Sequence, residues 1–101
     1  MRAIKRLAKQ IACEVKQAEC YAKDALEHKS TRPALADMYY KMGSTALECA
    51  SNLHNSAQKL VAEQKENGIE PPEFMLDKWE KDHSKAIEDM AMVRIYLDMY
   101  R

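Results

Sequence analysis

Glycine and proline are scarce in this chain of 101 residues, which has two glycines and three prolines. Because these residue types favour turns, their scarcity leaves room for very few loops. The sequence also lacks a Gly-rich phosphate loop, a Gly-x-Ser-x-Gly elbow and a Cys-x-x-Cys motif. Hydride transfer on a dinucleotide-binding unit, P-loop chemistry and elbow-type hydrolysis therefore have no support. We predict no catalytic residues, and a non-enzymatic function is favoured over an enzyme.

An excess of charge of either sign is also missing, because sixteen basic and sixteen acidic residues give a formal net charge of zero. General nucleic-acid binding is therefore not expected. No apolar run approaches the ~20 residues needed to span a bilayer, so no membrane partner is expected. Three cysteines, an odd number, do not form a disulfide framework and suggest a reducing compartment, which favours a cytoplasmic location.

The sequence is instead rich in heptad spacing, which is most regular between Leu35 and Leu60. Apolar or small residues recur there in steps of four and three, as in a seam where one helix contacts another. The seam consists of Leu35, Tyr39, Met42, Ala46, Cys49, Leu53, Ser56 and Leu60. Beside it lie a small stripe (Ala36, Gly43, Ala50, Ala57) and a large stripe (Tyr40, Leu47, His54, Val61). So wide an apolar surface predicts a central helix with both other helices packed against it.

Two further segments carry heptad seams of their own. The first seam is Ile4, Ala8, Ile11, Val15, Ala18, Ala22 and Ala25, and the third is Leu76, Trp79, His83, Ala86, Met90, Val93, Leu97 and Tyr100. We therefore expect an all-α fold, an antiparallel bundle of three long helices over about 2–29, 32–66 and 72–100, forming one domain over 1–101. The bundle would be a helical hairpin plus a third helix, completed by oligomerisation.

The end of the third helix predicts a contact surface. Met92, Ile95, Tyr96 and Met99 add apolar side chains outside its seam, so the last turns are apolar nearly all round. Methionine and tyrosine are frequent in protein interfaces. We expect these four residues to contact a partner, most simply another copy of the chain in a homodimer or higher oligomer.

A metal site is the second possibility, because Glu80 and His83 form a Glu-x-x-His pair on one helix face. This pair is half of what a di-iron or di-manganese carboxylate bundle needs, and Glu14 beside the first seam could add an inward carboxylate. The remaining ligands of such a site are not evident. His83 and His54 are interpreted more simply as hydrogen-bonded residues at the edge of the core, so no cofactor is predicted, although a metal ion at Glu14, Glu80 and His83 remains open.

Four segments resemble a known group of proteins. They are Glu14 to Ala22 (EVKQAECYA), Leu35 to Tyr40 (LADMYY), Asn52 to His54 (NLH) and His83 to Asp89 (HSKAIED). In these segments the chain resembles small ferritin-like helical proteins encoded by phages and prophages of gut bacteria. The resemblance implies that the bundle is a ferritin-like hairpin plus a third helix. It also implies a cytoplasmic helical protein of the bacterial host, in a setting where small proteins often act by binding host components or signals.

Three functions follow from these observations as hypotheses. The first is a non-enzymatic helical binding protein of the phage or prophage type, which binds a host protein or a small signal as a homo-oligomer. The second is a ferritin-like metal carboxylate protein. The third is a sponge that sequesters a small anionic, nucleotide-like ligand between subunits, for which Arg94 or Arg101 could bind the anion.

Overall fold

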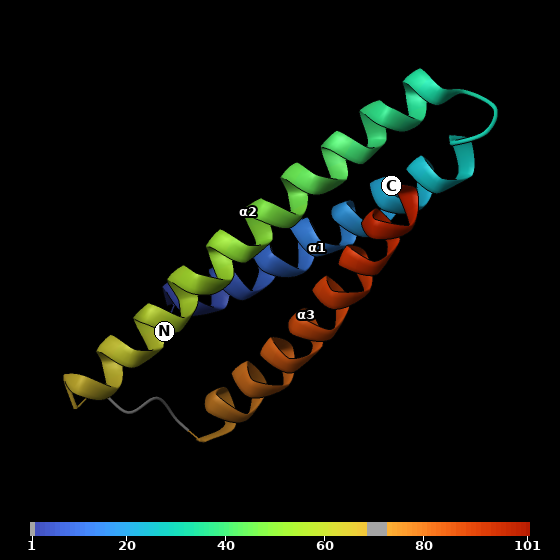
Figure 1. Ribbon diagram of the computed structural model, residues 1–101. Coiled ribbons are helices and arrows are strands. Elements are labelled where there is room, and N and C mark those ends of the chain that lie inside the picture. The colour runs from blue at the N-terminus through green and yellow to red at the C-terminus, as the bar shows by residue number, and fades with distance from the viewer. Residues whose placement is uncertain (1, 69–72) are drawn as a thin grey trace.

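The computed structural model describes residues 2–68 and 73–101, and in those residues it contains three helices and no strand. The helices are α1 (Arg2–His28), α2 (Pro33–Glu66) and α3 (Glu73–Tyr100). Figure 1 shows that they form an elongated bundle in which each helix runs antiparallel to the next, and the Cα atoms extend over 55 × 17 × 17 Å. The predicted all-α bundle of three long helices is therefore confirmed.

The ends of α2 follow from local residue types. Pro33 occupies the first turn, where its missing N–H costs nothing and its fixed φ suits a helix. At the other end the backbone N–H of Asn67 donates to the Glu63 carbonyl oxygen, and that of Gly68 donates to the Lys65 carbonyl oxygen. Gly68 has a φ of 72°, a conformation that glycine adopts without steric cost. The connection expected between the second and third helices includes residues 69–71, which lie outside the described residues, as does residue 72, the expected start of the third helix.

The helix in the middle of the bundle is α1. Both other helices pack along it, whereas α3 touches α2 only lightly. The prediction that the central segment of the sequence would hold the other two helices was therefore wrong. The reason is side-chain size, because α1 presents Ala18, Ala22 and Ala25, each fully buried, and these residues let neighbouring helices approach closely.

The buried face of α2 is also displaced from the predicted seam. The small stripe of Ala36, Gly43, Ala50 and Ala57 is buried, together with Ala46. Three members of the predicted seam, Met42, Cys49 and Ser56, are exposed instead. The small stripe is favoured because it lets the backbone of α2 lie against α1: a Cβ atom built on Gly43 would lie 3.4 Å from the backbone nitrogen of Ala22.

The seams predicted for α1 and α3 are confirmed by burial. All members of both seams are buried or half-buried. They form one core cluster around Ile11, Val15 and Trp79, and a second around Val93 and Leu97. At the second cluster the end of α3 is held by a stack of Tyr100 on Tyr40, whose ring centroids are 4.8 Å apart.

The close approach at Gly43 generates the first prediction. Gly43→Leu and Ala50→Leu should each lower the free energy of unfolding by about 1 to 3 kcal/mol, because a long side chain overpacks the α1–α2 contact. Gly43→Ala should be tolerated, since its Cβ would meet its neighbours at 3.4 Å, an ordinary contact. In addition, alanine stabilises a helix interior by about 1 kcal/mol relative to glycine. Urea unfolding measures these changes. Ala34→Leu, at an exposed position of α2, is the control and should leave stability nearly unchanged.

Candidate functional site

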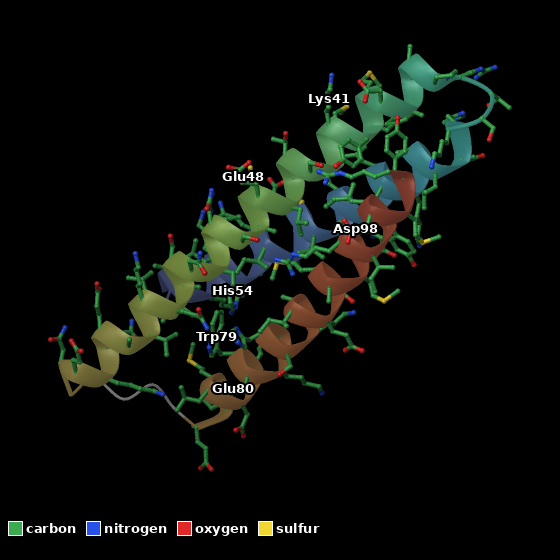
Figure 2. All side chains as sticks on the ribbon, viewed as in Figure 1. Lys41, Glu48, His54, Trp79, Glu80 and Asp98 are labelled. Atoms are coloured by element: carbon green, nitrogen blue, oxygen red, sulfur yellow. The ribbon has the colours of Figure 1, made fainter. Side chains whose placement is uncertain are left out.

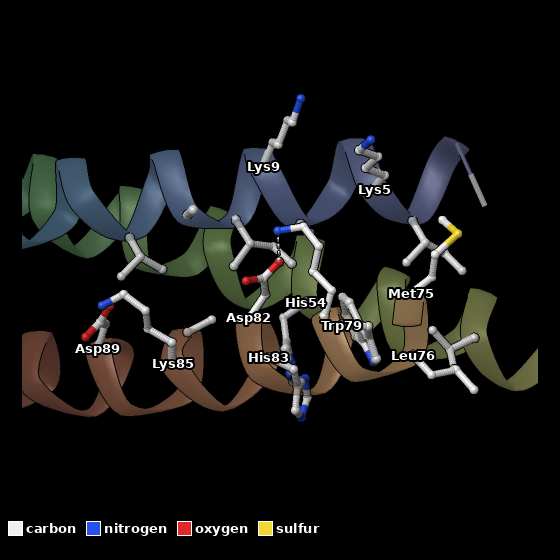
Figure 3. Close-up of a pocket in the computed structure, with 18 of the residues that line it drawn as sticks. Lys5, Lys9, His54, Met75, Leu76, Trp79, Asp82, His83, Lys85 and Asp89 are labelled. Atoms are coloured by element: carbon white, nitrogen blue, oxygen red, sulfur yellow. Dashed lines mark hydrogen bonds and ion pairs between the residues drawn. The ribbon is translucent and has the colours of Figure 1, made fainter. Parts of the chain in front are cut away.

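A cavity with a volume of about 620 Å³ lies between α1 and α3. We call it the α1–α3 cavity. It is lined by α1 from Ile4 to Glu19, by α3 from Phe74 to Asp89, and by three side chains of α2, His54, Val61 and Gln64. Figure 3 shows α1 and α3 on opposite sides of it, with α2 behind. Its volume falls within the range of about 300 to 1,000 Å³ that is usual for small-molecule sites.

Short side chains on facing helices produce this cavity. Ala8 and Ala12 of α1 and Ala86 of α3 line its walls, and no side chain from these positions can reach across to the opposite helix. Larger apolar residues complete the walls at Ile11, Val15, Val61, Met75, Leu76 and Trp79. The result is a mainly apolar space rather than a filled core. Native interiors, by contrast, are normally packed without voids of this size.

One polar atom in the cavity wall has no partner. Gln64 Oε1 is buried and accepts no hydrogen bond from any described residue, although Gln64 lines the cavity. Leaving a buried acceptor unsatisfied costs about 1 to 3 kcal/mol, so buried polar atoms normally have partners. Gln64 is therefore a candidate for contact with a bound molecule.

The charged groups around the cavity are mostly engaged elsewhere. On α3, Lys78 pairs with Asp82 at 3.4 Å and Lys85 with Asp89 at 3.1 Å. On α1, Glu19 pairs with Lys23 at 2.8 Å, and in Figure 3 the labelled Lys5 and Lys9 project from the side of α1 that faces away from α3. The cavity is therefore bordered by ion pairs on α3, whereas Lys5, Lys9 and Lys16 line it from α1 and form no ion pair with a described residue.

Two histidines meet at the inner side of the cavity. His54 Nε2 lies 2.9 Å from His83 Nδ1, and their rings stack with centroids 4.6 Å apart. The Trp79 ring centroid lies 5.4 Å from that of His83, and Figure 2 shows His54 and Trp79 in the space between α2 and α3. One imidazole must donate and the other accept in this hydrogen bond. The two histidines thus bond to each other at the edge of the core, as the simpler interpretation of the sequence expected.

The environment of His54 lowers its pKa below the usual value of 6.5. Burial is the largest cause, because it disfavours the charged imidazolium, and the charge of a protonated His83 adds to the effect. A hydrogen bond with Asn55 opposes both. His54 therefore favours its neutral form.

The three predicted metal ligands are not brought together. Glu80 is exposed, Glu14 is half-buried on α1, and His83 is bonded to His54. Glu14 lines a shallow depression between α1 and α2 beside Tyr21 and Cys49, whereas His83 lies at the α1–α3 cavity. Within residues 2–68 and 73–101 no three side chains of His, Cys, Asp or Glu are grouped so as to hold a metal ion. Heptad spacing placed Glu80 and His83 on one helix, but it did not provide ligands from the other helices.

The predicted contact residues of α3 are largely exposed. Met92, Ile95 and Met99 have exposed fractions of 42%, 50% and 60%. Tyr96 differs, because it is half-buried, packs against the core cluster that contains Val93, and lies beneath the Lys23 ammonium, 5.6 Å from the ring centroid. The exposed apolar surface at this end of α3 is therefore made by the two methionines and Ile95.

Sequence reasoning did not identify the α1–α3 cavity or Gln64. The signal available was the presence of alanines on the seams of both helices, Ala8 on the first and Ala86 on the third. We interpreted alanines only as a means of close approach. They have that effect at Ala18 and Ala22, but at Ala8 and Ala86 the helices stay apart and the short side chains leave space.

The lowered pKa of His54 generates the second prediction. Below about pH 6.5 His54 takes up a proton in the unfolded chain, whereas the folded chain resists this protonation. The stability contributed by neutral His54 is therefore present above that pH. It is lost as the pH falls through the pKa of His54 in the folded chain. Urea unfolding at about pH 7.5 and pH 5.5 should show wild type losing more stability than His54→Gln. Equal losses of stability in the two proteins would contradict the prediction. The carboxylates are present in both proteins, so their contribution to the pH dependence cancels in the comparison.

Comparisons with known proteins found no matching family model, no matching curated protein and no matching solved structure. None of α1, α2 and α3 has an apolar stretch of the length needed to cross a membrane. The resemblance of the sequence to ferritin-like phage proteins stays a prediction. The functional argument therefore depends on the cavity and on the exposed face of α3.

Proposed function

We propose that this chain is a non-enzymatic helical binding protein, and that the α1–α3 cavity holds a small, mainly apolar ligand. The cavity is the observation that carries this proposal, because about 620 Å³ lined largely by apolar side chains is the usual form of a small-molecule site. The paired histidines offer an acid–base group, but the described residues that line the cavity include no cysteine. Of the sequence-based hypotheses, binding of a small signal fits this geometry best.

A second candidate function is self-association through the outer face of α3, as a homodimer or higher oligomer. The exposed Met92, Ile95 and Met99 support it, because soluble monomers seldom expose contiguous apolar patches of more than a few hundred Å². A second copy is the simplest partner, since a symmetric contact needs only one self-complementary surface. Binding a host protein through this face is the alternative partner, and the phage setting is the proposed context of either interaction.

Xenon tests the binding cavity, because xenon enters apolar protein cavities without depending on the shape or polar groups of a larger ligand. Wild type should give a saturable shift in the xenon-129 resonance. Ala86→Phe places a ring in the cavity and should reduce this shift severalfold, whereas Ala91→Phe, at an exposed position of the same helix, should leave it unchanged. Equal xenon responses of wild type and Ala86→Phe would contradict the proposed site, provided that circular dichroism shows both proteins folded.

Charges on the outer face of α3 test self-association. Ile95→Glu with Met99→Lys should reduce the particle mass measured by light scattering, because burying these charges in a contact is costly, and the helical signal should persist. Tyr96 is left in place because it packs within the chain. Ile87→Glu, whose side chain is similarly exposed at 45%, is the matched control and should keep the wild-type mass. A wild type that is monomeric at micromolar concentration would contradict self-association.

A further inference from the structure

The charges that line the α1–α3 cavity are unbalanced, although the whole chain has a formal net charge of zero. Five lysines line the cavity against three carboxylates. Each of these carboxylates already pairs with a lysine of its own helix: Glu19 with Lys23, Asp82 with Lys78, and Asp89 with Lys85. The three lysines that line the cavity from α1 form no ion pair with a described residue; they are Lys5, Lys9 and Lys16. The lining therefore carries an excess of positive charge, and this excess lies on α1.

These lysines follow the apolar seam of α1 along one side. Lys5, Lys9, Ala12 and Lys16 recur in steps of four and three, and each comes directly after a member of the seam. That spacing places them in a stripe beside the buried face of the helix. All three lysines are exposed, so the stripe borders the cavity on its solvent side. The cavity thus combines apolar walls with a basic edge.

Lys5 and Lys9 suit a single anionic group, because residues four apart on a helix are neighbours on its surface. Lys16 is seven residues beyond Lys9, about 10 Å along the helix, and is too far away to share that group. In Figure 3 the labelled Lys5 and Lys9 extend from α1 away from α3. A lysine can lay its flexible apolar stem along such a wall and keep the ammonium in water. An anionic group held there stays hydrated and avoids the large cost of burying a charge.

Other polar groups of the lining are less suited to an anion. The free atom of Gln64 is an acceptor, and a carboxylate brings no donor to it. His54 and His83 are bonded to each other, and Lys78 and Lys85 are paired with carboxylates of α3. The α1 edge is therefore the part of the lining that best complements a negative charge.

We propose that the ligand of the α1–α3 cavity is an amphipathic anion, with a mainly apolar body between α1 and α3 and one anionic group at the cavity edge beside Lys5 and Lys9. This inference rests on the proposed binding function and adds the charge of the ligand and the place of its charged group. Carboxylates and phosphates share the required chemistry, because both accept charge-assisted hydrogen bonds from ammonium groups.

A single amphipathic molecule is favoured over the surface of a membrane. A helix that binds a membrane surface turns its apolar face outward, into the lipid. The apolar face of α1 is instead turned into the bundle, where Ile4, Ile11 and Val15 are buried. A bilayer could meet the lysines, but its acyl chains could not reach the cavity walls while they remain in the bilayer.

The test uses decanoate as the probe and the fluorescence of Trp79 as the readout. Trp79 is the single tryptophan of the chain and lines the cavity, so its emission should change when the cavity is occupied. Decylammonium has an apolar chain of the same kind and the opposite charge, and at about pH 7.5 carboxylates are ionised and amines protonated. We expect decanoate to bind with saturation and severalfold more tightly than decylammonium, and this preference should shrink as salt is added. Ala86→Phe, which fills the cavity, should abolish the response to both compounds.

Decyl phosphate distinguishes the two kinds of anionic head. A preference for either decanoate or decyl phosphate over decylammonium supports the proposal, and the tighter of the two anions identifies the head group. All compounds are used below the concentrations at which they form micelles, so that single molecules are measured.

Variants assign the anionic group to its partners. Lys5→Gln with Lys9→Gln should weaken decanoate binding about threefold to tenfold, the range expected for two exposed charge contacts, and should not weaken decylammonium binding. Lys16→Gln should have a smaller effect, because Lys16 lies farther along α1. Lys59→Gln with Lys65→Gln is the matched control, since it removes two exposed lysines of α2 outside the cavity lining and changes the net charge equally. It should bind decanoate as wild type does, and circular dichroism verifies that each variant is folded.

Two results would overturn the ligand class and leave the proposed function intact, provided that xenon binds wild type and fails to bind Ala86→Phe. The first is a lack of preference for either anion over decylammonium, or unchanged binding of the preferred anion when Lys5 and Lys9 are replaced. The second is sedimentation of wild type with phosphatidylglycerol vesicles when neither free anion binds, which would show attraction to a membrane surface.

Two further results would overturn the proposed function together with the ligand class. Loss of a dimer in Ala86→Phe, seen by light scattering, would show that a second copy occupies the cavity. A wild type that binds neither xenon nor either anion would show that the cavity is not a binding site.

Discussion

The close contact between α1 and α2 depends on side chains no larger than a methyl group. Ala18, Ala22 and Ala25 on α1, and Ala36 and Ala50 on α2, are fully buried. The backbone contact at this interface fixes the two helices as a rigid hairpin, because any larger side chain would push them apart. It also leaves the remaining apolar face of α1 available for α3. The position of α1 in the middle of the bundle is thus a consequence of residue size rather than of chain order.

The packing of α3 differs at its two ends, and this difference creates the candidate site. At its C-terminal end Val93 and Leu97 fill the space against Ala18 and Ala22 of α1. Towards its N-terminal end, Ala86 is the residue whose short side chain leaves the α1–α3 cavity open. One end of the helix is therefore packed against α1, whereas the other end borders the cavity in which we propose that a ligand binds. Such a division is reasonable for a small binding protein, because a cavity lowers stability and must be supported by good packing elsewhere.

Polar groups at the cavity have unequal roles. The hydrogen bond between His54 and His83 pairs one ring nitrogen of each side chain and ties α2 to α3, two helices that otherwise touch only lightly. Gln64 Oε1 has no such partner. A satisfied pair stabilises the fold, whereas an unsatisfied acceptor in an apolar cavity is a feature that a ligand can exploit. Gln64 therefore keeps an acceptor free on the cavity wall, whereas His54 and His83 are bonded to each other.

The sequence by itself determined the helical class and the buried faces of α1 and α3, because heptad spacing fixes which side of a helix is apolar. It did not determine the buried face of α2, where the seam through Met42 and Cys49 and the small stripe through Gly43 and Ala50 have the same period. Only the tertiary structure decided that choice, along with the pairing of His54 with His83, the separation of Glu14 from Glu80, and the cavity beside Gln64. The physical reason is that distances between helices depend on the side-chain volumes of all three helices at once, whereas a periodic pattern describes one helix at a time.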